Sequence, residues 1–168
     1  MATTSRNLFH HLPPPAECLA ILIGTAQLTI FGVAGLANPS QWAQGFGIPT
    51  ILPSKTQQHP GTIEASSAET ANDKEVQDAQ KALIAACAVR NVEKGILLLT
   101  LGLVLRDRKV LGIATGLGLV TTVTDYFLVK WYGVKEAAFG HVIGVMNSLL
   151  IGGSLLYWQR DDPWWWKA

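Results

Sequence analysis

Four long apolar runs, separated by prolines, glycines and charged clusters, dominate the 168-residue chain. A helix needs about 20 mostly apolar residues to cross the roughly 30 Å hydrocarbon layer, since it rises about 1.5 Å per residue. The runs cover about residues 16–36, 81–105, 110–129 and 138–158. This pattern predicts an all-α integral membrane protein, a four-helix bundle that forms a single membrane domain over residues 1–168.

The ends of the runs carry the residues expected at a membrane surface. Three prolines precede the first run and Asn38-Pro39 follows it, so the chain breaks where a helix should end. Aromatic rings prefer the headgroup level, and they stand at the ends of the later runs and in the C-terminal tail, at Trp131, Tyr132, Tyr157, Trp158 and Trp164–Trp166.

The first run has an alternative interpretation as a cleaved signal peptide, with Gly35-Leu36-Ala37 as the cleavage site. We favour a retained helix because the run is longer than the roughly 7–15 residues of a signal core. The compact, basic turn Arg106–Lys109 places both termini in the cytoplasm. No other targeting address is present, which leaves the endoplasmic reticulum as the expected membrane.

Residues 38–80 are predicted to form a long extramembrane loop. The first half mixes aromatics with glycine, which is typical of a short interfacial helix or turn. The second half, from Ser54 to Asp78, is polar and poor in aromatics, which predicts a mobile loop with a helical lead into the second run. We expect no chemistry from this segment.

Charge and motif content exclude several classes of function. A net charge of +1 provides no basic face for nucleic acid. Cys18 and Cys87 lie in apolar runs and are interpreted as small core residues, and His10-His11 are expected to be solvated. No serine-nucleophile, phosphate-loop or zinc-protease motif is present, so we expect neither a metal nor a cofactor.

Small residues recur at the spacing that lets helices approach closely in lipid. The pairs are Gly112 with Gly116 and Gly140 with Gly144. Packing within the chain is favoured over a dimer interface, while a homo-oligomer stays open.

Polar residues inside the apolar runs carry the functional hypothesis, because an ionisable group there costs a few kcal/mol and needs a partner or a task. At about 1.5 Å per residue, four runs place polar groups in the same half of the membrane. The residues are Gln27, Arg90, Asn91, Glu93, Lys94, Asp125, Tyr126, His141 and Asn147.

These residues predict a pocket open toward the long loop. A carboxylate and an imidazole can act as acid and base on one substrate, with a guanidinium to orient it. We expect Asp125 and His141 as the acid/base pair, Arg90 as the orienting group and Glu93 as a second carboxylate. The expected substrate-binding residues are Gln27, Asn91, Tyr126 and Asn147, although a helix contact is the simpler role for Tyr126.

The same residues have a purely structural interpretation. Arg90 and Glu93, three positions apart on one helix, can neutralise each other, with Asp125 bonding Arg90 and His141 bonding a backbone carbonyl. Buried charge networks of this kind fix helix register. Both interpretations stay open at this point.

Short motifs in a fixed order give the chain a family resemblance. Asn38-Pro39, the stretch from Gly45 to Pro49, the stretch from Val89 to Gly95, Thr124-Asp125 and Gly140-His141 together resemble the fungal and bacterial domain-of-unknown-function family 4267. That family has Arg-Asp where this chain has Arg90-Asn91, so Asn91 removes one acid. Either Glu93 substitutes for that acid or the site is altered. The resemblance implies a small four-helix membrane protein, with some fungal members encoded beside secondary-metabolite genes.

The resemblance and the polar residues together favour an enzyme of lipophilic secondary metabolism. A hydrolase, cyclase or isomerase without a cofactor would act on a polyketide or terpenoid, and the partners are then the lipid bilayer and a lipophilic small molecule. The alternative is a non-catalytic multi-pass protein, an assembly partner or a small binding or permeation module, whose charges fix helix packing.

Overall fold

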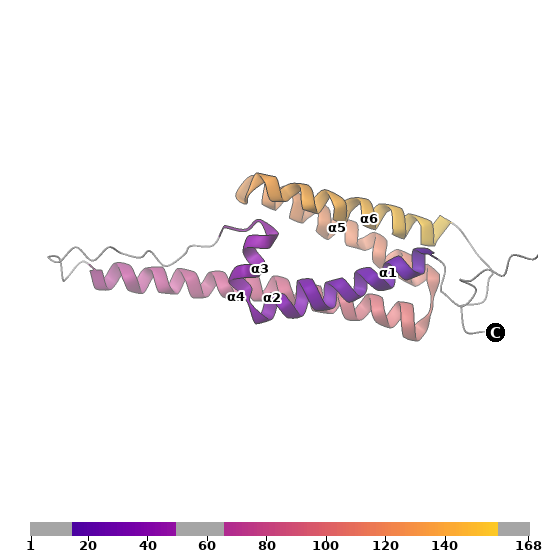
Figure 1. Ribbon diagram of the computed structural model, residues 1–168, viewed down its shortest axis with the longest axis horizontal. Coiled ribbons are helices and arrows are strands. Elements are labelled where there is room, and N and C mark those ends of the chain that lie inside the picture. The colour runs from indigo at the N-terminus through magenta and orange to yellow at the C-terminus, as the bar shows by residue number, and fades with distance from the viewer. Residues whose placement is uncertain (1–14, 50–65, 158–168) are drawn as a thin grey trace, which may run out of the picture.

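A computed structural model describes residues 15–49 and 66–157, and Figure 1 shows how their helices are arranged. The first rod consists of α1 (Pro15–Ala26), a π-helical segment (Gln27–Val33) and α2 (Ala34–Ala37), and the short α3 (Pro39–Phe46) follows. The rest of the bundle is α4 (Ser66–Leu99) with a second π-helical segment (Thr100–Leu105), α5 (Arg108–Tyr132), a 3-10 turn (Lys135–Ala137) and α6 (Ala138–Tyr157). The described residues contain no β-strand, so the all-α prediction is confirmed.

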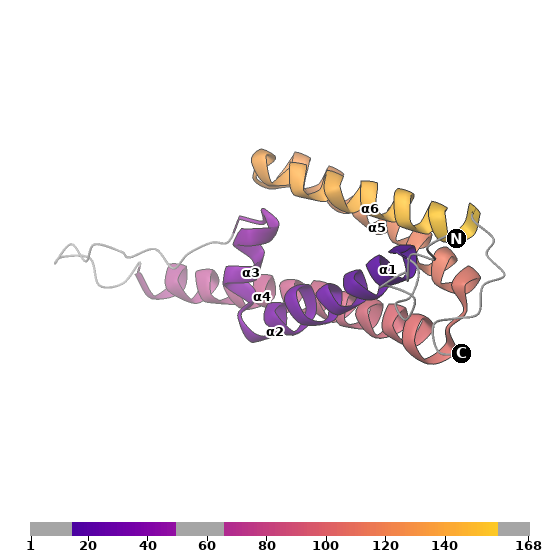
Figure 2. The ribbon, with the colours of Figure 1, turned by 45° about the vertical axis from the view of Figure 1, so that its right-hand side comes forward.

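The long helices run alternately up and down and form two antiparallel pairs. The first rod packs along α4, and α5 packs along α6. Figures 1 and 2 show the two pairs close together where α1 begins and further apart near α3.

Membrane character is shown by the outer surface as well as by helix length. Three described segments, Pro15–Ala37, Arg108–Tyr132 and Lys135–Tyr157, are long and apolar enough to cross a membrane. Large apolar side chains on them point outward, among them Leu22, Val120 and Leu150, each at least 60% exposed. So much exposed apolar surface is expected of helices that face lipid.

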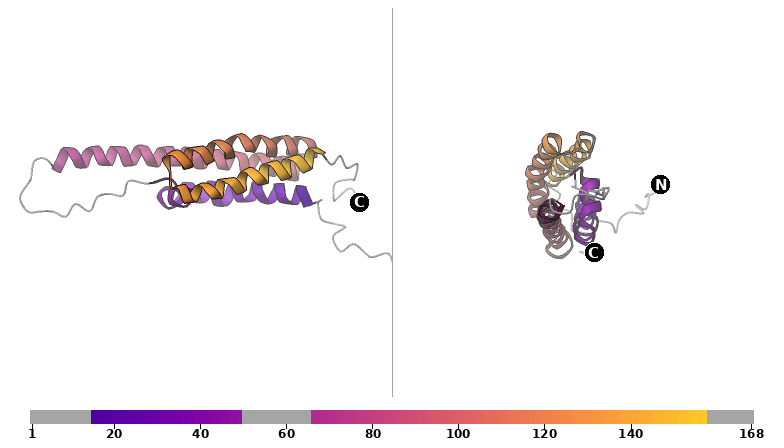
Figure 3. Two further views of the ribbon diagram at one scale, coloured as in Figure 1. Left: turned by 90° about the horizontal axis from the view of Figure 1, so that it is seen from above. Right: turned by 90° about the vertical axis from the view of Figure 1, so that its left-hand side faces the viewer.

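The helix over the predicted second span differs from expectation in two ways. It begins at Ser66 instead of Lys81, and Figure 3 shows it projecting beyond the bundle. It is also not among the described segments that are long and apolar enough to cross a membrane, and it carries the charged residues Arg90, Glu93 and Lys94. Part of the predicted 38–80 loop is therefore helical, in α3 and in the first turns of α4. The tail tryptophans, Trp158 and His10-His11 lie outside the described residues.

A tight core and an ion pair close the end of the bundle where α1 begins. The core residues Ala20, Leu98, Leu101, Leu111, Ile151 and Leu155 come from all four long helices. Beside them, Arg108 Nη1 lies 3.1 Å from Oε1 of Glu17, whose side chain is 1% exposed. Arg108 also donates to the carbonyls of Leu155 and Ser154. One guanidinium thus ties α1, α5 and α6 together.

At the opposite end, α3 bridges the two pairs. Asn38 accepts from Gln41 N and Pro39 follows at the first helical position, a favourable helix start. Gly47 ends α3 at φ +83, and a Cβ there would meet Ala137. Its carbonyl accepts from Val134 N at 2.9 Å. The Asn38-Pro39 and Gly47 motif positions therefore begin α3 and fix its end against the α5–α6 turn.

Glycines mark the closest helix contacts, only partly where the sequence predicted them. A Cβ at Gly112 would meet Leu155 and one at Gly144 would meet Thr122, so both lie at the α5–α6 contact, whereas no atom would meet a Cβ at Gly116 or Gly140. The sequence analysis missed Gly95, where a Cβ would stand 2.5 Å from Leu28 N and 2.8 Å from the Gly24 carbonyl oxygen. The first rod and α4 cross there almost backbone to backbone.

Gly95→Ala tests this crossing. Backbone atoms of Leu28 and Gly24 cannot rotate away, so the two helices must separate, and overpacking of this kind costs about 1–3 kcal/mol. Gly153→Ala is the control, because nothing lies within 4 Å of a Cβ there. Thermal denaturation of the detergent-solubilised protein should show a lower midpoint for Gly95→Ala alone. Equal midpoints for the two variants would refute the close crossing.

Candidate functional site

A cavity of ≈ 520 Å³ lies between the two helix pairs, on the α3 side of the tight core. Its walls come mainly from the first rod, α4 and α5, and Ser148 contributes from α6. The apolar side chains that line it are Ile23, Leu97, Leu98, Leu101, Val110, Ile113, Ala114 and Leu117. The polar ones are Gln27, Arg90, Glu93, Lys94, Thr115, Thr121, Thr122 and Ser148. This mixture of a few polar groups in an apolar cavity is typical of small-molecule sites.

Arg90 reaches across the cavity wall to Asp125 on α5. Its Nη2 donates to both carboxylate oxygens, at 3.2 Å and 3.1 Å. The Asp125 side chain is 13% exposed and that of Arg90 is 35% exposed. Arg90 also lines the cavity, and its Nε atom is buried without a hydrogen-bond partner. The pair joins the two halves of the bundle.

Lys94 and Glu93 occupy the next turn of α4 and differ in how they are held. Lys94 Nζ donates to Thr121 Oγ1 on α5, which forms a second polar link between the halves. No ion pair or hydrogen bond joins Glu93 to another described residue. Glu93 is therefore the carboxylate of the cavity wall that is available to a ligand.

Gln27 stands where the first rod changes from α-helix to π-helix. Isolated π-helical turns often mark functional positions, because they free backbone groups and re-aim side chains. The Gln27 side chain lines the cavity, and its buried Oε1 has no partner. In the same segment the carbonyl of Phe31 accepts from Asn91 Nδ2 at 3.3 Å. The Asn91 side chain thus contacts the π-helix instead of the cavity.

The other three predicted site residues lie elsewhere. His141 packs on α3, with its Nε2 3.4 Å from the Phe46 carbonyl oxygen. Its ring lies edge-on to the Phe46 ring, with 4.5 Å between the two ring centroids. Tyr126 lines a separate groove between α5 and α6, and Asn147 is exposed on α6. The structure therefore brings Arg90, Asp125, Glu93 and Gln27 together and places His141, Tyr126, Asn147 and Asn91 apart from the cavity.

Several polar residues of the structure escaped the sequence analysis. Hydroxyls in apolar helices give little signal, because most bond their own backbone, as Thr115 does to the Leu111 carbonyl. Glu17 could have been singled out, because it is the one acidic residue of the first run and a carboxylate there needs a partner. Among the described residues, no three His, Cys, Asp or Glu side chains are grouped closely enough to hold a metal ion.

Comparison with known proteins gives one result. The profile of the family described as Domain of unknown function (DUF4267) matches residues 25–155. No curated protein and no solved structure gives a significant match. The matched range contains every residue that lines the cavity except Ile23.

A double-mutant cycle of Arg90→Gln and Asp125→Asn tests the link across the cavity. Removing one partner leaves the other charge poorly solvated, so each single variant should lose stability. The double variant should lose less stability than the sum of the two single-variant losses. We expect a coupling energy of about 1–3 kcal/mol, measured by denaturation in detergent.

The same cycle on Lys81 and Asp78, an exposed pair at 3.3 Å on one helix, is the control. It should show coupling below about 1 kcal/mol. Strictly additive effects at Arg90 and Asp125 would mean that the pair does not hold the two halves together.

Proposed function

Since the chain belongs to the Domain of unknown function (DUF4267) family, we propose that it binds a lipophilic small molecule with uncharged oxygen functions inside the membrane. The cavity between the helix pairs is the observation that carries the proposal. Its ≈ 520 Å³ falls in the range of about 300–1,000 Å³ that is usual for small-molecule sites. A polyketide or terpenoid has this size and chemistry, and the endoplasmic reticulum membrane is the location we propose.

Charge at the cavity favours an uncharged ligand. Arg90 and Lys94 contribute two positive charges, and Glu93 with Asp125 contribute two negative charges, so the group is formally neutral. A charged ligand would leave one charge uncompensated in an apolar setting, which is costly. Hydroxyl, carbonyl or ether oxygens instead fit the uncharged polar side chains that line the cavity, such as Thr122 and Ser148.

Acid/base conversion of that ligand is the second candidate function, and the free carboxylate of Glu93 favours it. In an isomerisation or cyclisation, Glu93 would take a proton from one position of the ligand and return it to another, so no co-reactant is needed. Arg90 would stabilise negative charge that develops on a ligand oxygen. In this assignment Asp125 positions Arg90, and His141 holds α3 in place.

A purely structural role suits part of the same network. Arg90–Asp125 and Lys94–Thr121 both join α4 to α5, as expected of contacts that fix helix packing. Glu93 and Gln27 make no such link, although they line the cavity. Variants of Glu93 therefore separate chemistry from packing better than variants of Asp125.

Filling the cavity tests binding. Gly118 lines it, so the side chain in Gly118→Leu should displace a ligand, whereas Gly153→Leu adds the same side chain where nothing is near. Compounds extracted from the purified full-length protein should include a lipophilic oxygenated molecule, measured by mass spectrometry. We expect its amount to fall at least about tenfold in Gly118→Leu, which corresponds to about 1.4 kcal/mol, and to persist in Gly153→Leu. Equal retention by both variants would exclude binding in this cavity.

Metabolite profiles of a deletion strain test catalysis. Complementation with Glu93→Gln should leave a precursor unconverted, because loss of a general base costs about 10²–10⁴ in rate. Asp125→Asn at matched protein abundance should convert it in part, since Asp125 acts through Arg90. If Glu93→Gln restores the native profile, the protein binds its ligand without converting it.

A further inference from the structure

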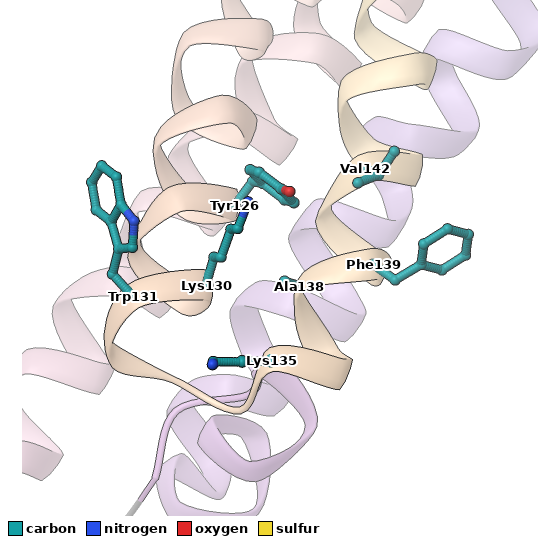
Figure 4. Close-up of a pocket in the computed structure, with 7 residues that line it drawn as sticks. All are labelled: Tyr126, Lys130, Trp131, Lys135, Ala138, Phe139 and Val142. Atoms are coloured by element: carbon teal, nitrogen blue, oxygen red, sulfur yellow. The ribbon is translucent and has the colours of Figure 1, made fainter.

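A second concavity lies at the α3 end of the molecule, on the groove between α5 and α6. It measures ≈ 580 Å³ and is lined by seven residues, which Figure 4 shows as sticks. The polar ones are Tyr126, Lys130 and Lys135, and Trp131, Phe139 and Val142 supply most of the apolar surface. None of these residues lines the cavity between the helix pairs, so this groove is a separate feature.

Two elements each contribute one lysine to the groove. In Figure 4 the Tyr126 ring lies between the helices with Lys130 beside it, while Lys135 extends below them from the α5–α6 turn. The Lys130 ammonium sits 5.5 Å from the centre of the Tyr126 ring, a cation–π arrangement that holds it inside the groove. The groove therefore concentrates positive charge in a concave site.

No acidic partner compensates this charge in the described part of the chain. Neither lysine forms an ion pair there, and no carboxylate lines the groove. Glu136 neighbours Lys135 in sequence but is exposed and forms no ion pair with either lysine. The site thus has about two unbalanced positive charges, in contrast with the neutral cavity.

The position of the groove identifies the kind of anion. It lies at the ends of two membrane-spanning segments, Arg108–Tyr132 and Lys135–Tyr157, at the level where headgroups are found. Phe139 and Val142 continue it along α6 with apolar surface. A free inorganic anion would make no favourable contact with that surface. We propose that this groove binds the phosphate headgroup of an anionic phospholipid, with its acyl chains along α6.

Native mass spectrometry of the full-length protein tests the site. Detergent-purified protein is mixed with equal amounts of phosphatidylglycerol and phosphatidylcholine, and the lipid adducts are counted. The native form should retain phosphatidylglycerol about tenfold more than phosphatidylcholine, since each lysine near a headgroup contributes several-fold. Lys130→Gln/Lys135→Gln should remove this preference. The matched control, Lys74→Gln/Lys109→Gln, changes net charge equally at two exposed lysines outside the groove and should keep it.

Charge-preserving variants and a free anion complete the test. Lys130→Arg/Lys135→Arg should retain the preference, and inorganic phosphate at millimolar concentration should neither stabilise the protein nor displace phosphatidylglycerol. The proposal is overturned by equal retention of both lipids in the native form, by equal loss in the two glutamine double variants, or by displacement with inorganic phosphate. The native-form comparison decides the matter even where the Lys130→Gln/Lys135→Gln protein does not fold.

Discussion

The charge on α4 is the constraint on which the rest of the bundle depends. Lipid offers no partner to a charged side chain, so Arg90, Glu93 and Lys94 need partners or water within the protein. Two of the three find them on α5, at Asp125 and Thr121. The first rod covers the neighbouring face of α4 at a glycine crossing close enough to bring backbones together. Polar links on one side and close packing on the other thus hold α4 among more apolar helices.

The cavity follows from how these contacts are distributed. The apolar core and the Glu17–Arg108 pair draw all four helices together at one end. At the other end α3 spans the gap, with the Phe46 carbonyl against His141 and Gly47 bonded to Val134. Between the two closures the pairs are joined mainly through polar side chains, which are long enough to leave space. A hollow, partly polar interior is therefore a consequence of the architecture.

Much of the fold could be predicted from sequence, and much of the site could not. Helix number and alternating direction follow from apolar runs longer than a bilayer requires. A helical lead into the second run was predicted, but the start of α4 at Ser66 could not be, because polar residues that are helical outside the membrane have no apolar periodicity. Arg90 and Asp125 could be paired in advance because opposite charges in lipid seek each other. The structural interpretation predicted that His141 bonds a backbone carbonyl, as it does, but the partner Phe46 could not be identified because it lies 95 positions away.

Photolabelling in native membranes tests most directly whether the cavity between the helix pairs holds an oxygenated lipophilic ligand. A hydroxylated hydrocarbon carrying a diazirine is activated with and without excess unlabelled competitor, and the modified peptides are mapped by mass spectrometry. The account predicts labels at cavity residues such as Leu98 and Thr121 that the competitor removes, and labels at the exposed Leu150 of α6 that it does not. Labels on the outer surface alone, or equal competition at both places, would contradict it.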